Sequence, residues 1–284
     1  MGNSHTNLSQ WAAHVYISDT PPDEVKYLLE SVPSLTSLSA CFPTMLKMYS
    51  SALVLLLCAS TSLSQHIVSD PASACQSIGS TFQSQDVTVN FAQYVPAGTN
   101  LTLEQDDNLA SCARPSQVVP VDLCRVAMLV KTSNISNITL EAWLPTNWTG
   151  RFSSTGNGGV SGCIQYEDLA YTASFGFATV GANNGHNGTS GNAFYQNAEI
   201  VADFAWRSVH TGVVVGKELT KAYYQQDYSK SYYLGCSTGG RQGFKSAQDF
   251  PDDFDGIVAG APAVAFDNLT SWSGHFCTRP PQHS

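Results

Sequence analysis

A glycine-flanked serine in the last quarter of the chain could act as a nucleophile. Gly235, Ser237 and Gly239 form a G-x-S-x-G pattern between an apolar stretch of strand length and a helix-like stretch. A serine at this position sits on a sharp, strained turn that projects its hydroxyl above a sheet. A side chain at either flanking glycine would crowd that turn. The pattern predicts a serine that forms an acyl-enzyme. The alternative is a glycine-rich turn with a surface serine.

An acyl transfer of this kind also needs N–H donors for the developing oxyanion. The helix after the serine would aim its first N–H groups at that charge, and Thr238 would supply one of them. A second donor is expected from an earlier glycine-rich loop, for which residues 156–159 are the candidate. Gly158 or Gly159 would let the backbone of this loop approach the substrate.

Cys236 lies beside the serine and is a rival nucleophile. The chain has no CxxC pair with metal-ligand or redox spacing, and an oxidising compartment would make a free thiolate a liability. A disulfide that joins this turn to another loop is the preferred interpretation of Cys236.

The elements that must position these groups alternate between strands and helices. Apolar side chains that recur at three- and four-residue steps predict a helix over 198–224, and a second helix over 241–248 follows the serine. Alternating helices and apolar strands indicate an α/β fold with a largely parallel sheet that is covered on both faces. The predicted strands are 87–91, 125–130, 138–144, 175–181, 231–234 and 257–260.

The first part of the chain predicts export. Lys47 precedes a short apolar run at 52–59, and small residues follow it, which is typical of a secretory signal peptide. The run is too short to span a bilayer, which needs ~20 apolar residues. Because signal peptides begin at a chain's N-terminus, Met45 or Met48 is the expected biological start. The alternative is a buried core helix with a basic flank. The predicted divisions are 1–44, an upstream extension; 45–64, the signal peptide; and 65–284, a partial catalytic domain.

Glycosylation signals and cysteines agree with a secreted protein. Six N-x-S/T sequons lie downstream of the apolar run, and such sites accept glycans only in a secretory lumen. The sequons begin at Asn100, Asn134, Asn137, Asn147, Asn187 and Asn268. The cysteines after the signal are Cys75, Cys112, Cys124, Cys163, Cys236 and Cys277. Disulfides are their default state outside the cytosol, but any four of them allow three pairings.

The composition excludes two classes of partner. The 284 residues are 43% hydrophobic and 12% charged, which is a packable composition, and the net charge is -9. An acidic chain gains nothing from counterion release on phosphates, so nucleic acid is not an expected partner. The same charge argues against docking on an anionic membrane surface.

The last third of the chain resembles the tannase and feruloyl esterase family of secreted fungal-type serine esterases. The resemblance is carried by residues 203–210, by 233–243 with its Cys-Ser-x-Gly-Gly signature, and by 250–263. It extends more weakly over 70–275. The resemblance implies an α/β-hydrolase-like fold, a mostly parallel sheet with flanking helices. It also implies a serine carboxylic ester hydrolase for a small phenolic or plant cell-wall ester, such as a feruloyl or galloyl ester.

The same resemblance implies a disulfide pattern and a metal. In the family, the cysteine before the nucleophile pairs with a cysteine that follows the catalytic histidine; Cys236 matches the first half, and the second half cannot be placed. The early cysteines of the family imply the pairs Cys75–Cys124 and Cys112–Cys163. Full-length relatives are expected to bind calcium in an inserted lid, whereas no cofactor is expected in this chain.

The chain also departs from the family pattern. Family members are nearly twice as long as the segment after residue 64, so the lid and the last strands are expected to be missing. Triad order is Ser, then Asp or Glu, then His, yet only His275 and His283 follow Ser237. Too few strands separate His275 from the serine for it to be a good candidate base, and His186 precedes the serine, which leaves it lining the site or in a surface loop.

Three hypotheses follow for the chain as it stands. The first is an esterase segment with a nucleophile and an oxyanion hole but without the triad acid and base, and therefore nearly inactive alone. The second is a non-catalytic secreted remnant that binds carbohydrate or phenolic compounds. The third is an unstable gene-model fragment. Nothing in the sequence indicates the oligomeric state.

Overall fold

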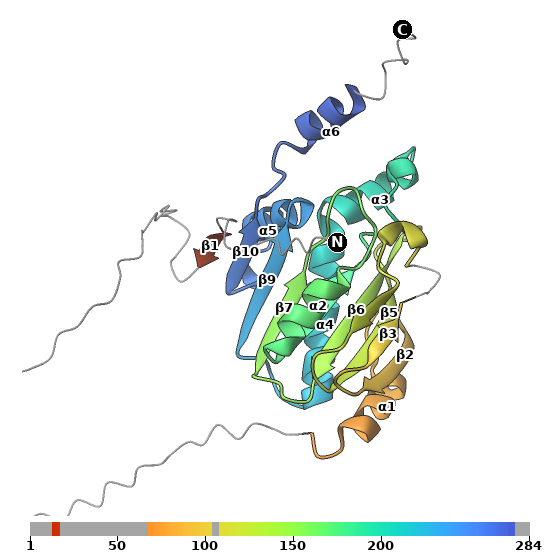
Figure 1. Ribbon diagram of the computed structural model, residues 1–284, viewed down its shortest axis with the longest axis vertical. Helices are drawn as coiled ribbons and strands as arrows, with labels where there is room; N and C mark the ends of the chain where they lie inside the picture. The colour runs from red at the N-terminus through yellow and green to blue at the C-terminus, as the bar shows by residue number, and fades with distance from the viewer. Residues whose placement is uncertain (1–12, 18–67, 104–107, 276–284) are drawn as a thin grey trace, which may run out of the picture. The chain divides into compact units, whose positions relative to one another are not determined.

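The computed structural model describes residues 13–17, 68–103 and 108–275 (Figure 1). The predicted signal peptide at 45–64 lies outside these residues, as do Cys277 and His283. No described helix has both the length and the apolar character that a membrane span requires.

A mixed eight-stranded sheet forms the centre of the domain, in the order β1-β10-β9-β7-β8-β6-β5-β2. Strands β8, β7, β9 and β10 are parallel to one another, whereas β2, β5, β6 and β8 are joined by antiparallel pairs, and β1 pairs antiparallel with β10. The strands are β1 (Ala13–Ile17), β2 (Val87–Val95), β5 (Leu123–Lys131), β6 (Asn137–Pro145), β7 (Arg151–Thr155), β8 (Phe177–Ala182), β9 (Lys230–Cys236) and β10 (Gly256–Gly260). A separate hairpin pairs β3 (Asn100–Thr102) with β4 (Ser116–Val118).

Helices cover both faces of the sheet (Figure 1). The apolar sides of α1, α4 and α5 pack on one face, and α2 packs on the other. The longer helices are α1 (Pro71–Thr81), α2 (Tyr166–Ser174), α4 (Ser208–Tyr224), α5 (Thr238–Asp249) and α6 (Phe266–His275). The shorter ones are η2 (Ala110–Cys112), η3 (Gly191–Phe194), α3 (Ala198–Ala202), η4 (Asp203–Arg207) and η5 (Pro251–Asp253). This is the α/β-hydrolase-like architecture that the sequence predicted, with an antiparallel half that it did not.

Strand β6 shows why the central strands read as nearly continuous apolar runs. Leu140, Ala142 and Leu144 pack into the core on the α4 face, while Trp143 packs into the core on the α2 face. Glu141 lies on the α2 face, where it accepts hydrogen bonds from Arg125 Nε at 2.8 Å and Tyr166 Oη at 2.8 Å. A strand that is covered on both sides keeps a charge only when that charge is paired.

The helix expected over 198–224 is present but contains a π-turn, η4. Asp203 begins this turn with a fully buried carboxylate, which accepts hydrogen bonds from Thr132, Ser136 and Arg207. The wider turn tilts the helix axis locally, so α3 and α4 are separate segments. The apolar periodicity does not reveal this insertion.

Candidate active site

Ser237 occupies the turn between β9 and α5 with an unusual backbone conformation. Its φ of 59° and ψ of -117° lie in a region that non-glycine residues rarely adopt. The Ser237 N–H donates to Gly260 O at 2.9 Å, and its carbonyl accepts from the N–H groups of Arg241 and Ala263 at 3.1 and 3.0 Å. The side chain is exposed. The strained turn therefore presents its hydroxyl at the surface, at the carboxyl end of a parallel strand.

The glycines around this turn are required by close approach of other backbone atoms. A Cβ on Gly235 would lie 2.7 Å from both the carbonyl carbon and the carbonyl oxygen of Gly239. A Cβ on Gly240 would overlap Gly260 O and lie 2.8 Å from Pro262 Cα. Both distances are shorter than real Cβ contacts, so the crowding that the G-x-S-x-G pattern predicted is present at Gly235.

The loop at residues 156–159 lies beside the first turn of α5. Thr238 Oγ1 donates to Gly159 O at 2.7 Å, and the Asn157 N–H donates to Gln242 Oε1 at 3.0 Å. At its start, the Gly156 N–H extends the ladder of the sheet by donating to Leu234 O at 2.9 Å. The structure thus brings together Ser237, Thr238 and the loop that contains Gly158 and Gly159.

Two N–H groups in this arrangement have no acceptor among the residues that the structure describes. Thr238 is the first residue of α5, and the N–H of such a residue has no intrahelical acceptor. The Gly158 N–H likewise makes no protein hydrogen bond. Gly159, with φ of 58°, turns the chain directly after it. The arrangement can supply donors from two chain segments to one negatively charged oxygen.

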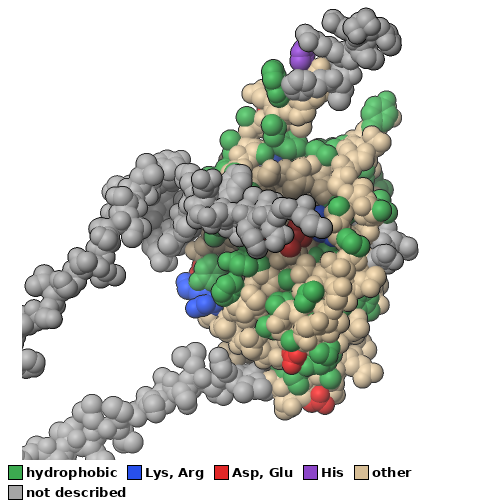
Figure 2. Space-filling view, viewed as in Figure 1, with side chains coloured by type: hydrophobic (Ala, Val, Ile, Leu, Met, Phe, Trp, Pro, Cys, Tyr) green, Lys and Arg blue, Asp and Glu red, His purple; other side chains and the backbone are tan. Residues whose placement is uncertain are grey.

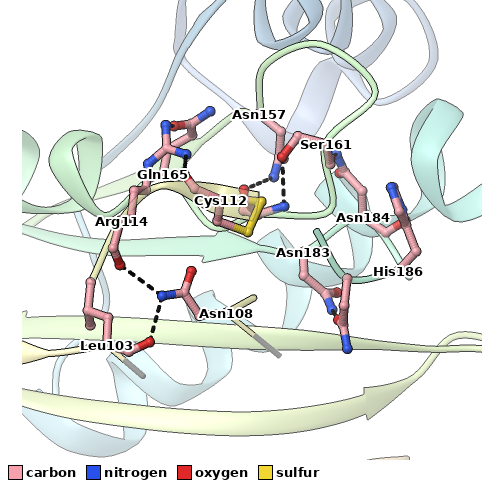
Figure 3. Close-up of a disulfide and its surroundings, with 12 residues drawn as sticks. Leu103, Asn108, Cys112, Arg114, Asn157, Ser161, Gln165, Asn183, Asn184 and His186 are labelled. Carbon is pink, nitrogen blue, oxygen red and sulfur yellow. Dashed lines mark hydrogen bonds between the residues drawn. A yellow bond between two sulfur atoms is a disulfide. The ribbon is translucent and has the colours of Figure 1, made fainter. Parts of the chain in front are cut away.

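Hydrogen bonds from buried amide side chains fix the position of the glycine loop (Figure 3). Asn157 Nδ2 donates to Cys163 O at 2.7 Å and to Ala182 O at 2.8 Å. Gln242 Nε2 donates to Asn184 Oδ1 at 2.9 Å, and Asn184 Nδ2 donates to Ser161 O at 3.1 Å. These buried amides link β7, β8 and α5, so the loop has little freedom to move away from the serine. No sequence pattern predicted the roles of Asn157, Asn184 and Gln242 in holding this loop.

Tyr233 lies beneath the turn and contacts both glycine segments. Its Oη donates to Gly239 O at 2.8 Å. A Cβ on Gly156 would overlap the Oη of Tyr233. Burial raises the pKa of Tyr233 far above its ordinary value, so the phenol stays protonated and remains a donor.

Two disulfides join the early part of the chain to the sheet and to the site. They link Cys75 to Cys124 and Cys112 to Cys163, which are the pairs that the family resemblance implied. The second bridge lies next to the amide of Asn157 (Figure 3). Cys236 has an exposed thiol that bonds to none of the other four described cysteines. Cys277 lies outside the described residues, so the disulfide expected for Cys236 stays a prediction.

Loss of the Cys112–Cys163 bridge should weaken the fold and loosen the glycine loop. A crosslink between residues 51 apart constrains the unfolded chain by about 4 kcal/mol in the loop-entropy model. We expect the double change Cys112→Ser, Cys163→Ser to lower the free energy of unfolding by about 2–4 kcal/mol in urea titrations. We also expect faster amide hydrogen exchange at residues 156–160.

The bridge between Cys75 and Cys124 offers a matched control, because it spans 49 residues but joins α1 to β5. Removing it should cost similar stability while exchange at residues 156–160 stays slow. Equal exchange in the two double variants would contradict a specific role of Cys112–Cys163 at the loop.

Neither His186 nor His210 has a hydrogen bond to Ser237. His186 is buried, its Nε2 lies 2.9 Å from Val160 O, and its ring contacts Phe194. It therefore adjoins the loop after Gly159, one of the two places that the sequence allowed. His210 Nδ1 pairs with Asp253 Oδ2 at 2.8 Å, and His275 is exposed on α6, stacked with Trp272.

Asp168, in the first turn of α2, has a pKa raised to about 6. Burial is the main cause and the neighbouring Glu167 adds to it, while Arg114 opposes both. An unfolded aspartate titrates near pH 4, so between about pH 4 and 6 the unfolded chain gives up this proton before the folded chain does. Asp168 therefore makes the fold less stable as the pH rises through this window.

Asp168→Asn should remove this pH dependence. We expect the variant to unfold with a free energy about 1–2 kcal/mol higher than the parent chain at pH 7.5, because the buried charge is gone. Below pH 4 the difference should vanish, since the aspartate is then protonated in both states. Urea titrations at several pH values would measure it, with exposed Asp252→Asn as the control. A constant difference from pH 4 to 7.5 would contradict the assignment.

The remaining predicted features concern modification and metal binding. All six sequon asparagines are exposed, so a glycan could extend from each without disturbing the core. Over residues 13–17, 68–103 and 108–275, no group of three or more His, Cys, Asp and Glu side chains gathers as a metal site would require.

Comparisons with known proteins match the same segment. A family model described as "Tannase and feruloyl esterase" matches residues 123–279. The chain is 66% identical over 209 residues to "Probable feruloyl esterase B-2" of Aspergillus terreus, covering 73% of this chain and 39% of that protein. It is also 66% identical over 202 residues to "Feruloyl esterase C" of Talaromyces stipitatus, covering 71% of this chain and 38% of that protein.

Solved structures agree with these matches. The crystal structure of an esterase from Aspergillus oryzae superposes with a TM-score of 0.72 at 62% identity, covering 75% of this chain and 42% of that chain. The crystal structure of feruloyl esterase B from the same organism gives a TM-score of 0.70 at 56% identity, covering 73% and 41%. The chain therefore spans about two fifths of the length of the relatives that it matches.

Proposed function

Because the chain belongs to the tannase and feruloyl esterase family, we propose that it carries the nucleophile and oxyanion hole of a secreted carboxylic ester hydrolase. The observation that best supports this proposal is the exposed Ser237 on its strained turn, beside the first N–H of α5 and the glycine loop. The names of the relatives favour phenolic esters, so feruloyl or galloyl esters of plant cell-wall material are the proposed substrates.

In this proposal Ser237 Oγ attacks the ester carbonyl carbon. The N–H groups of Thr238 and of Gly158 or Gly159 stabilise the resulting oxyanion, the alcohol leaves, and the acid stays bound to Ser237 as an acyl-enzyme. Water then attacks the acyl carbon and releases the acid. A serine hydroxyl needs a base for the first step, and neither His186 nor His210 contacts it. We therefore expect the 284-residue chain alone to hydrolyse esters at least about a thousandfold more slowly than its longer relatives.

The proposal is tested by supplying the remainder of a longer relative. Residues 68–275 would replace the aligned segment of the Aspergillus terreus relative, which is 66% identical to this chain. We expect this chimera to hydrolyse methyl ferulate or methyl gallate, while the 284-residue chain alone does not do so measurably. A chimera that folds with its disulfides intact and binds phenolic compounds without turnover would support the non-catalytic remnant instead.

Secretion and glycosylation belong to the same proposal. The six exposed sequon asparagines, from Asn100 to Asn268, favour a glycosylated extracellular protein. Calcium is proposed only for the lid that full-length relatives are expected to carry.

A further inference from the structure

Arg241, one helical turn after Ser237, has an incompletely paired guanidinium. Its Nη1 donates to Ala205 O at 3.1 Å. Its Nε and Nη2 are buried, and no residue in the described part of the chain accepts a hydrogen bond from either. Buried polar atoms without a partner are rare in folded proteins, because each forfeits its hydration without compensation.

Two other arginines of this protein bind a carboxylate with the edge formed by Nε and Nη2. Arg125 Nε and Nη2 donate to the two oxygens of Glu141 at 2.8 and 2.5 Å. Arg114 uses the same two atoms on Glu167, at 2.7 and 2.6 Å. The parallel N–H bonds of this edge match the two oxygens of a carboxylate in spacing and direction. Arg241 presents the same edge with no carboxylate from the described residues.

Electrostatics distinguish Arg241 from the other two arginines in the same way. The hydrogen bonds that Arg125 and Arg114 donate to Glu141 and Glu167 outweigh the effect of burial and raise the pKa values of both arginines. For Arg241, burial lowers the pKa, and no carboxylate offsets it. The guanidinium remains a cation at neutral pH, and an anion at its free edge would be strongly stabilised there.

Aromatic rings surround this cation. Its central carbon lies 5.2 Å from the ring centre of Phe204 and 5.1 Å from that of Phe266. Phe194 adjoins Phe204 with their ring centres 4.9 Å apart. An aromatic carboxylate could accept hydrogen bonds from Nε and Nη2 of Arg241 while its ring packs against Phe204 and Phe266.

Helix α6 lies beside the guanidinium of Arg241, through its first residue Phe266. Phe266 begins this helix, which has no buried residue, and Val264, Leu269 and Trp272 are 67%, 50% and 64% exposed. Figure 2 shows hydrophobic side chains on the surface over this helix, at the upper end of the view. Because Nε and Nη2 of Arg241 are buried and Phe266 lies over the guanidinium, a ligand would reach them only after a covering side chain moved.

We propose that Arg241 is an anion-binding residue that takes the carboxylate of an aromatic acid, with Phe204 and Phe266 contacting the ring. The choice of a benzoic or cinnamic acid as the ligand rests on the proposed function, because these are the acids that phenolic ester hydrolysis releases. The acid then binds one helical turn from the serine that would generate it, and its accumulation competes with further substrate.

The proposal can be tested on the chain itself by titration calorimetry at constant ionic strength. Ferulate and benzoate would be compared with their uncharged methyl esters. We expect both acids to bind at least about tenfold more tightly than the esters. Arg241→Met keeps the aliphatic stem and loses the charge, whereas Arg241→Lys keeps the charge and loses the Nε–Nη2 edge. Both should weaken acid binding at least about tenfold.

Arg151→Met is the matched control, because Arg151 is an exposed arginine that lies over Phe177 at the other end of β7. It should leave acid binding unchanged. Acids and esters that bind equally, or acids that bind unchanged to both Arg241 variants, would overturn the proposal, as would a correctly folded parent chain that binds no acid. An inactive chimera, together with acid binding that depends on Arg241, would contradict the proposed function but support this binding site.

Discussion

Ser237→Ala in the active chimera should lower kcat for methyl ferulate by at least about a thousandfold. The substitution removes the attacking oxygen, and losses of 10³–10⁶ are usual when a nucleophilic serine is removed. KM should change little, because the hydroxyl contributes to the reaction more than to substrate binding. Initial rates measured from ferulate release would show the split, and mass spectrometry should find acyl adducts only on the chain that keeps Ser237.

A second serine provides the control for this experiment. Ser174 is exposed at the end of α2, and its hydroxyl donates to Tyr171 O. Ser174→Ala should retain full turnover. A Ser237→Ala chimera that keeps more than a tenth of the parent rate would show that another group performs the attack and would remove the basis of the esterase proposal.

Gly156→Ala should be the most disruptive single methyl group that the site can receive. The new Cβ would overlap Tyr233 Oη and lie 2.7 Å from Gly239 Cα, and neither atom can retreat within the core. Either the loop moves away from Ser237 or Tyr233 loses its hydrogen bond to Gly239 O. We expect the free energy of unfolding to fall by about 3 kcal/mol or more. Urea titration would measure the loss in the chain, and the chimera should lose turnover with it.

The cause of this loss can be isolated with a double-mutant cycle. Tyr233→Phe removes the hydroxyl that the new methyl group meets, so the pair Gly156→Ala, Tyr233→Phe should lose less stability than the sum of the two single changes. Gly274→Ala is the control, since its Cβ would contact nothing within 4 Å in α6. Strict additivity of the two core changes would show that the methyl group acts by some other route.

The parts of the site that the sequence made predictable are those encoded by local backbone demands. A G-x-S-x-G turn after an apolar strand requires glycine at fixed offsets, and Gly235 meets the crowding expected there. The glycine loop was found for the same reason. Asn157, Asn184 and Gln242 were missed because amides give no periodic signal, and their partners lie far away in the chain.

The fold could be predicted where the hydrophobic pattern was strong. Strand β7 has the sequence RFSST, and its Ser153, Ser154 and Thr155 are buried although none is apolar, because neighbouring strands on both sides supply the hydrogen bonds. Such a strand has no apolar signal to read. Helix α1 begins with a helix-start signal, an Asp70 cap followed by Pro71, but no helix was predicted there.

Strand direction and cysteine pairing were harder to obtain. The short connection between β5 and β6 is compatible with a hairpin, so this antiparallel pair was within reach of turn-length arguments. The bonding state of Cys236 was not within reach, because pairing depends on distances between loops that no local pattern encodes.

The phenolic oxygen of Tyr233 has a consequence for protein engineering. It lies where side chains on Gly156 and Gly235 would have to go, and it holds the carbonyl of Gly239. These four positions, Tyr233 and the glycines at 156, 235 and 239, therefore constrain one another sterically. Grafting the serine turn onto another scaffold would require the tyrosine to travel with its glycines, and sequence drift in related chains should change all four together or none.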